Sequence, residues 1–166
     1  MINRDYNRRE QIIFGCDLDE QNDEHFQKEY NRLRSKDVID RDEESAIFSK
    51  YYVGGVKGFE NMSISTLKQL LKEGFIRGES RHNDSPTVNQ MLKFADSIRE
   101  LEPDMIIKFE GFATSPSHGD GCVSIDGITF ESRYHVNRRA LDEFWKFIKS
   151  ADEVSMDDTS GRGWWD

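Results

Sequence analysis

The most regular hydrophobic pattern in the chain lies in residues 62–75, MSISTLKQLLKEGF. Apolar residues recur there at the spacing of one helix face, between Ser63 and Gly74. Ser63 is a favourable N-cap residue, and Met62 before it can pack on the first turn as a hydrophobic staple. Gly74 suits the left-handed residue that follows many helices. The pattern therefore predicts a helix over 64–73.

Two more segments place apolar residues on one face of a helix. Pro86 after Ser85 is a favourable first helical residue, which predicts a helix over 86–101 that ends before Pro103. Another helix is predicted over 137–150. The apolar faces of these two helices consist of Val88, Met91, Leu92, Ala95 and Ile98 in the first, and Leu141, Phe144, Trp145 and Ile148 in the second.

The first forty residues are the most charged part of the chain. Within them, the apolar run 11–14 predicts a short strand. After this run, a narrow apolar stripe predicts a mostly exposed helix. Beyond the first forty residues, a second helix is predicted over 42–53, and the glycine pair 54–55 ends it. The stripe consists of Phe26, Tyr30 and Leu33.

From residue 105 the hydrophobic period changes from about four to two. In MIIKFEGFAT, Ile107 and Phe109 face one way and Lys108 and Glu110 face the other, which predicts a strand over 105–114. This strand is expected to be buried on one face and partly covered on the other.

Asp126 and Gly127 lie between the short β-prone runs CVSI and ITFE. Asp-Gly between such runs favours a two-residue hairpin turn, because a type I′ turn needs positive φ at both central residues. Residues 105–131 are therefore predicted to form a three-stranded meander. The terminal run EVSMDDTSGRGWWD predicts a closing hairpin.

These elements predict one α+β fold, in which a small antiparallel meander and hairpin sheet packs against several helices. Residues 1–60 form a charged, mostly helical N-terminal extension, either within the same domain or appended to it, and 61–166 form the core domain. The side chains expected to be mostly buried are Leu67, Leu70, Val88, Leu92, Ile107, Phe109, Ile125 and Leu141.

The chain has 32 acidic and 23 basic residues among 166, giving a net charge of −9. Duplex nucleic acid needs clustered Lys and Arg, so we expect no nucleic-acid partner. We expect a soluble, cytoplasmic protein with no membrane partner, because no apolar run resembles a membrane span or a signal peptide. Cys16 and Cys122 show no zinc-ligand spacing, so we expect no cofactor and no metal.

Residues 113–127, ATSPSHGDGCVSIDG, gather the residue types of nucleophilic catalysis. A catalytic triad draws its groups from separate segments that are held within hydrogen-bonding reach. Here the groups follow one another in a stretch whose Pro, Gly and Asp are typical of turns. We therefore predict a loop between two strands. The residues concerned are Ser115, Ser117, His118, Asp120 and Cys122.

Residues 12–20, IIFGCDLDE, place Asp17 and Asp19 directly after an apolar run. Two carboxylates in a D-x-D pattern can present oxygen ligands to Mg²⁺. The segment resembles the opening motif of the haloacid-dehalogenase phosphatases, which continues with Thr or Val where this chain has Glu20. The resemblance implies an alternative function, a small divalent-metal-dependent hydrolase using Asp17 and Asp19. The other interpretation is a strand end followed by an acidic helix N-terminus.

The terminal run GRGWWD carries two adjacent tryptophans. In a strand, Trp164 and Trp165 project to opposite faces, so one enters the core and the other needs a covering helix, side chain or partner. Tryptophan is enriched among the residues that contribute most to binding. We expect the outward tryptophan, together with Asp157, Asp158 and Asp166, to bind a protein with a basic surface.

Three stretches resemble uncharacterised small acidic proteins of bacteria and their phages: SISTLKQLLKEGFIRGESRHNDSPTV, FEGFATSP with VSIDGITFE, and ADEVS with the WWD ending. The resemblance covers roughly residues 61–166 and implies a bacterial or phage setting, without an activity. Two function classes remain. We favour a non-enzymatic protein-binding or inhibitory module of the immunity-protein or anti-defence type over the metal-dependent hydrolase.

Overall fold

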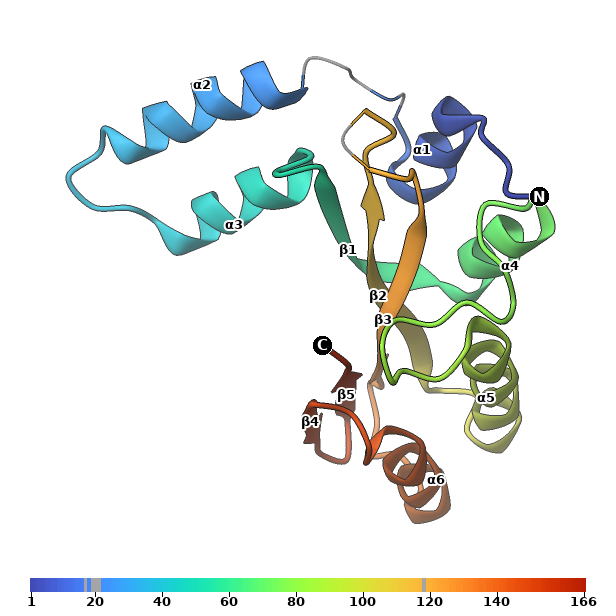
Figure 1. Ribbon diagram of the computed structural model, residues 1–166. Coiled ribbons are helices and arrows are strands. Elements are labelled where there is room, and N and C mark those ends of the chain that lie inside the picture. The colour runs from blue at the N-terminus through green and yellow to red at the C-terminus, as the bar shows by residue number, and fades with distance from the viewer. Residues whose placement is uncertain (17, 19–21, 118) are drawn as a thin grey trace.

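The computed structural model describes residues 1–16, 18, 22–117 and 119–166. This part of the chain contains six helices and one five-stranded sheet, which confirms the α+β class (Figure 1). In chain order the elements are α1 (Tyr6–Phe14), α2 (Asn22–Arg34), α3 (Arg41–Lys50), β1 (Val56–Ser63), α4 (Ile64–Lys72), α5 (Val88–Leu101), β2 (Ile106–Thr114), β3 (Val123–Glu131), α6 (Arg138–Ile148), β4 (Glu153–Met156) and β5 (Ser160–Trp164).

The strands lie in the order β1-β2-β3-β5-β4, and every neighbouring pair is antiparallel. Helices α4, α5 and α6 pack on one face, where α4 contacts β1 and β2, α5 contacts β2, and α6 contacts β5. The opposite face is called the open face below. Helices α2 and α3 form a helical hairpin, the arm (residues 22–50), which projects from the β1 end of the sheet (Figure 1).

The ends of α4 form as the local sequence predicts. The Ser63 hydroxyl accepts a hydrogen bond from the Thr66 amide at 3.1 Å, which caps the helix. At the other end Gly74 has a φ of +81°, and the Phe75 amide donates to the Leu70 carbonyl oxygen at 2.9 Å. These two features are those of a Schellman end.

Helix α5 begins two residues later than predicted. Its N-cap is Thr87, which forms a capping box with Gln90. Ser85 is buried, and its hydroxyl accepts a hydrogen bond from the His82 amide at 2.9 Å. Ser85 therefore organises the turn before the helix, and the prediction of Pro86 as the first helical residue is wrong, because Pro86 lies before the N-cap.

The predicted strand over 11–14 is wrong, because these residues form the end of α1. The helix is capped by Asp5, which accepts from the Arg8 amide at 3.1 Å. Arg9 and Glu10 are each 1% exposed, and their charged groups pair at 2.9 Å. Apolar periodicity cannot reveal a helix face that is buried through charged side chains.

Arg9 joins α1 to two other parts of the fold. Its guanidinium donates to the carbonyl oxygens of Thr114 and Gly121, at 3.1 and 2.5 Å, on either side of the β2–β3 loop. It also donates to the Tyr52 hydroxyl, at 2.9 Å, near the base of the arm. The N-terminal helix therefore fixes both the loop and the base of the arm.

The predicted turn at Asp126 and Gly127 is wrong, because β3 runs through both residues. Glu110 pairs with Gly127, whereas Gly111 pairs with Ile125, so Asp126 is an extra residue in a β-bulge. Gly127 lacks the positive φ that a type I′ turn requires. The predicted three-stranded meander is therefore a two-stranded hairpin of β2 and β3.

The apolar side chains form two separate cores. The larger one lies between the sheet and α4, α5 and α6, and it contains every residue predicted to be buried except Leu141, which is partly buried at its edge. The expectation that Trp145 belongs to the buried face of α6 is wrong, since 47% of this residue is exposed. The smaller core holds the arm and consists of Phe26, Leu33, Ile47 and Tyr51.

The predicted closing hairpin is confirmed as β4 and β5. No helix in the described part of the chain has the length and apolar character that a membrane span requires. The division of the chain at residue 60 stays a prediction.

Candidate functional site

Two β-bulges meet on the open face at Glu110. On the β1 side, a register shift places two residues, Glu60 and Asn61, opposite it. On the β3 side, the bulge residue Asp126 lies beside it. Bulges redirect side chains and are common next to functional sites. Together they bring the carboxylates of Glu60, Glu110 and Asp126 from three neighbouring strands to one place.

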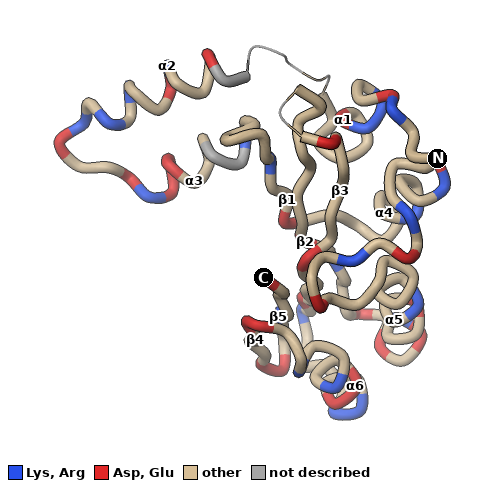
Figure 2. The backbone as a smooth tube through the Cα atoms, in the orientation of Figure 1, with Lys and Arg blue, Asp and Glu red and all other residues tan. Residues whose placement is uncertain are grey.

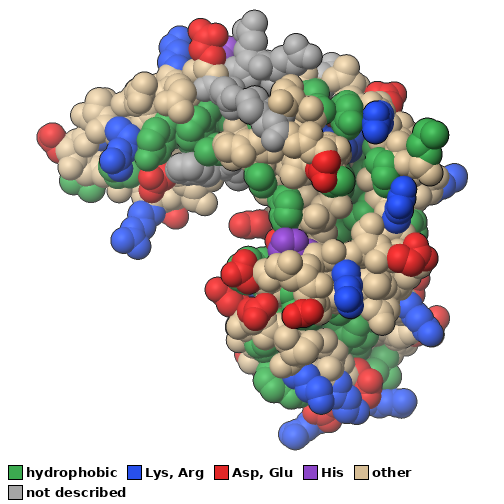
Figure 3. All heavy atoms as spheres, in the orientation of Figure 1, with side chains coloured by type: hydrophobic (Ala, Val, Ile, Leu, Met, Phe, Trp, Pro, Cys, Tyr) green, Lys and Arg blue, Asp and Glu red, His purple; other side chains and the backbone are tan. Residues whose placement is uncertain are grey.

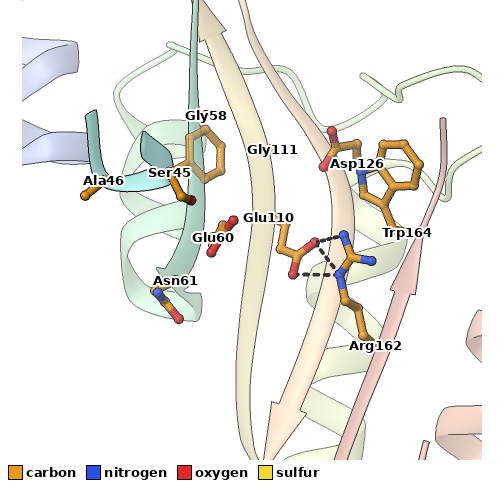
Figure 4. Close-up of a pocket in the computed structure, with 11 residues that line it drawn as sticks. Ser45, Ala46, Gly58, Glu60, Asn61, Glu110, Gly111, Asp126, Arg162 and Trp164 are labelled. Atoms are coloured by element: carbon orange, nitrogen blue, oxygen red, sulfur yellow. Dashed lines mark hydrogen bonds and ion pairs between the residues drawn. The ribbon is translucent and has the colours of Figure 1, made fainter. Parts of the chain in front are cut away.

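A groove of about 530 Å³ lies over these bulges (Figure 4). The sheet forms its floor, and α3 and β5 contribute its two sides. Figure 3 shows the molecular surface hollowed between the arm and the C-terminal hairpin. We call this site the open-face groove, and it is lined by Ser45, Ala46, Gly58, Phe59, Glu60, Asn61, Glu110, Gly111, Asp126, Arg162 and Trp164.

Arg162 on β5 is the only Lys or Arg among the described residues that line the groove. Its Nε donates to both carboxylate oxygens of Glu110, at 3.0 and 2.9 Å (Figure 4). A terminal nitrogen donates to Glu153 at 3.0 Å. The hydrogen bond to Glu110 raises the pKa of Arg162 above its ordinary value. The charge of Arg162 is therefore already engaged by two carboxylates.

Asp126 is buried, with 9% of its surface exposed. Burial raises the pKa of this carboxyl group, because its charged form loses hydration. The indole N–H of Trp164 faces the carboxylate, and together with His82 it acts to lower the pKa (Figure 4). Within the described residues, neither Lys nor Arg forms an ion pair with Asp126. It presents a buried carboxylate to the groove without a fixed countercharge.

Besides Ser45, the polar lining also includes Glu60 and Asn61, and both are exposed. In the described part of the chain, neither side chain forms a hydrogen bond or an ion pair. Figure 2 shows acidic positions on β1, β2 and β4. The groove thus offers three carboxylates and an amide, and only Glu110 has a strong internal partner.

The two tryptophans of the terminal run, Trp164 and Trp165, lie in different environments. Trp165 is fully buried in the larger core, whereas Trp164 is partly buried and lines the groove. The guanidinium carbon of Arg162 lies 5.7 Å from the centroid of the Trp164 ring. Trp164 is therefore the one predicted partner-binding residue that belongs to the groove.

The acidic residues predicted to accompany the tryptophans lie outside the groove lining. Asp157 accepts hydrogen bonds from the amides of Thr159 and Ser160, each at 2.8 Å, which lowers its pKa and organises the β4–β5 turn. Asp158 bonds the His135 ring, and the Asp166 amide donates to Asp152 at 2.9 Å. These residues serve the hairpin and surround it with negative charge.

The stretch with catalytic residue types connects β2 to β3, as predicted, in residues 115–117 and 119–122. The Asp120 carboxylate accepts from the Thr114 hydroxyl at 2.8 Å and from the Cys122 amide at 3.1 Å. A hydrogen bond from the Cys122 thiol, together with these two bonds, lowers the pKa of Asp120. Asp120 therefore holds the loop closed, while His118 lies outside the described residues.

Asp17 and Asp19, the predicted alternative metal ligands, also lie outside the described residues. Across the residues that the structure does describe, there is no group of three His, Cys, Asp or Glu side chains that could hold a metal ion.

Sequence reasoning did not assign a site role to Glu60, Glu110, Asp126 or Arg162. Charge within these strands does not mark the site by itself, because β1 and β2 also carry Lys57 and Lys108. The Asp126–Gly127 pair favours a turn by its local sequence and therefore does not indicate a site. Only the pairing of β1, β2, β3 and β5 shows that these charges share one face.

No protein-family model, curated protein or solved structure matches this chain.

Proposed function

We propose that this protein is a non-enzymatic binding module that holds a basic segment of a partner protein in the open-face groove. One observation carries the proposal. The described lining contains three carboxylates and one guanidinium, and that guanidinium is already paired with Glu110. The carboxylates of Glu60 and Asp126 therefore remain available to a cationic ligand, because no guanidinium of the lining neutralises them.

The charge of the whole chain supports the same class of partner. The net charge is −9, and Glu153 on β4 adds a further carboxylate near those of the groove on β1 and β2. Complementary charge raises the rate of encounter and discriminates against wrong partners more than it adds affinity. An acidic face of this kind selects a basic protein surface and disfavours nucleic acid.

Trp164 supplies the apolar part of the proposed contact. Its ring lies at the side of the groove, next to Asp126 and Arg162 (Figure 4). Binding energy in protein interfaces is concentrated in a few residues, often tryptophan, that a ring of polar contacts shields from water. The groove combines such an anchor with carboxylates that can fix the register of a basic segment.

The proposal extends to the biological class. A small acidic inhibitor or immunity-type protein of bacterial or phage origin would use such a surface to cover a basic site on its target.

The test compares two short peptides that differ only in charge, one rich in Lys and Arg and one with glutamine in their place. Isothermal titration calorimetry with the full chain should show binding of the basic peptide alone. The double variant Glu60→Gln, Asp126→Asn should weaken this binding by about tenfold or more, since charged hydrogen bonds contribute about 1.5–3 kcal/mol each.

The matched control is Glu100→Gln with Asp104→Asn, which removes two exposed carboxylates outside the groove. The control should bind like the wild type. Equal weakening in both double variants would mean that only total charge matters, and this outcome would contradict a groove-based function.

The alternative function, a divalent-metal-dependent hydrolase, depends on Asp17 and Asp19. Thermal unfolding in millimolar Mg²⁺ or Mn²⁺ separates it from the binding module. We expect an unchanged melting temperature. A saturable rise that Asp17→Asn abolishes would show a metal ligand bound to the native state and would favour the hydrolase.

A further inference from the structure

We propose that the open-face groove recognises arginine: the guanidinium group of one arginine from the partner enters the groove and bonds the carboxylates of Asp126 and Glu60. This inference rests on the proposed function and names the chemical group that the groove selects. It follows from the burial of Asp126, the pairing of Arg162, the floor of the groove and the placement of the two carboxylates.

Asp126 is the residue that most needs a ligand. Asp126 has 9% of its surface exposed, so it has lost most of its hydration. The Trp164 indole N–H faces its carboxylate, but within the described residues neither Lys nor Arg pairs with it. Burying a charge is unfavourable unless the charge is paired and hydrogen-bonded. An incoming cation would supply the missing pair, and the groove opens directly onto this side chain.

Arg162 shows that this site accommodates a guanidinium. Its Nε and a terminal nitrogen approach Glu110 to within 3.0 Å, and its central carbon lies 5.7 Å from the Trp164 ring centroid. A carboxylate and an aromatic ring are the two groups that guanidinium recognition combines most often. Arg162 satisfies Glu110 and leaves Glu60 and Asp126 for a second guanidinium.

Glycine keeps the floor of the groove low at Gly58 on β1, and Gly127 on β3, next to the lining residue Asp126, leaves room for the Glu110 side chain. A Cβ atom at Gly127 would lie 2.8 Å from the Glu110 carboxylate, so only glycine leaves that side chain in place. Gly58 is exposed, and a Cβ atom there would meet nothing closer than the Gly111 carbonyl oxygen at 3.8 Å. Backbone therefore forms the surface against which a flat group can lie.

The placement of the two carboxylates favours arginine over lysine. Glu60 lies on β1 and Asp126 on β3, with β2 between them, so their strands are two spacings of about 4.8 Å, or roughly 9.6 Å, apart. The planar guanidinium has five donors in a fixed fork and can reach two separated acceptors at once. The ammonium group of lysine is a compact point charge and would engage one of them.

The experiment uses three peptides of glycine and serine that carry a single arginine, lysine or citrulline at the same position. Citrulline has nearly the shape of arginine without its charge. We expect the arginine peptide to bind the full chain about fivefold or more tightly than the lysine peptide, since two-point charged contacts are stronger than one. The citrulline peptide should show no measurable binding.

Two variants locate the site by different means. Asp126→Asn removes the buried charge, and Gly58→Leu fills the groove without changing any charge. Each should abolish the preference for arginine, while Glu131→Gln on the same sheet face should leave it intact. Nuclear magnetic resonance of the Trp164 indole N–H, assigned with Trp164→Phe, should show a shift with the arginine peptide that saturates.

The outcomes separate the two proposals. Equal affinity for the arginine and lysine peptides, both dependent on Asp126, would overturn arginine recognition and leave the basic-segment groove standing. Binding of arginine that survives both Asp126→Asn and Gly58→Leu would also overturn it. If neither these peptides nor the Lys- and Arg-rich peptide binds, the proposed function fails as well.

Discussion

Trp164 and Trp165 are adjacent in the chain, but β5 and its end direct them to different environments. Trp165 has no exposed surface, whereas Trp164 lies at the side of the groove. We expect Trp165→Ala to lower the free energy of unfolding by about 3–5 kcal/mol, because it leaves a large cavity in the core. Urea denaturation followed by circular dichroism measures this loss.

Trp164→Ala should instead reduce affinity for the basic peptide while costing much less stability. Calorimetry of binding and denaturation of both variants distinguish the two roles. If Trp164→Ala destabilises the fold as much as Trp165→Ala does and leaves peptide affinity unchanged, Trp164 is structural and the binding surface lies elsewhere.

Gly163 allows α6 to approach β5 closely. A Cβ atom at this position would lie 2.6 Å from the Ile148 Cβ. We expect Gly163→Ala to destabilise the protein by about 1–3 kcal/mol, the usual effect of overpacking a core. Gly58→Ala is the matched control, because its Cβ would make only an ordinary contact at 3.8 Å. Equal midpoints of urea unfolding for the two variants would contradict this packing.

Burial could be predicted from the sequence for some residues and not for others. Leu67, Ile107 and Phe109 were predicted to be buried and are, because a regular apolar pattern is a direct signal of a core face. Arg9 and Glu10 were missed, because their burial depends on partners more than forty residues away. Hydrogen bonds from charged side chains to such distant carbonyl and hydroxyl groups leave no local sequence pattern.

At the scale of elements, the Asp126–Gly127 pair explains the main error in the predicted sheet. A two-residue turn and a β-bulge both favour small or polar residues, so the local sequence does not distinguish them. The partner strand decides between them. Here β2 continues past the pair and keeps β3 extended through it.

The ion pair that joins α1 to the end of α4 should make the stability of the fold depend on pH in acid. The guanidinium of Arg8 on α1 bonds both carboxylate oxygens of Glu73 at the end of α4, at 2.8 and 2.9 Å, and lowers the pKa of Glu73 from 4.5 to about 2. The unfolded chain therefore binds a proton at Glu73 more readily than the folded chain does. This contribution to stability is complete above pH 4.5 and is lost as the pH falls towards 2.

The variant Glu73→Gln isolates this effect. Its stability should change less than that of the wild type between pH 5 and pH 2.5, as measured by urea unfolding at each pH. Glu79→Gln, which removes an exposed carboxylate on the following loop, should retain the wild-type pH dependence. Parallel curves for the wild type and Glu73→Gln would contradict the assignment.

At the scale of the whole molecule, the candidate site is a product of topology. Its lining runs from Ser45 to Trp164 and comes from five different elements. Trp164 could be singled out from the sequence, because an exposed tryptophan at a strand end needs a partner. The carboxylates could not, because their shared face depends on the strand order and on two bulges.

Salt should slow the association of the basic peptide, because the attraction involves the charge of the whole molecule. Screening shortens the range of electrostatic attraction from about 10 Å at 0.1 M salt to about 3 Å at 1 M. We expect the association rate of the basic peptide to fall steeply over this range, while its dissociation rate changes less. Stopped-flow or surface-based kinetics measure both rates, and a salt effect confined to dissociation would contradict charge-guided encounter.

The separate small core of the arm gives the molecule two units that can open independently. Phe26, Leu33, Ile47 and Tyr51 pack with one another, apart from the larger core. Regions with few buried contacts exchange their amide hydrogens through local opening, below the free energy of global unfolding. Amides in α2 and α3 should therefore exchange before those of β2 and β3. Since α3 carries Ser45 and Ala46, which line the groove, a peptide in the groove should slow amide exchange in the arm. Exchange in the arm would then report whether the groove is occupied, without a label on the peptide or on the groove.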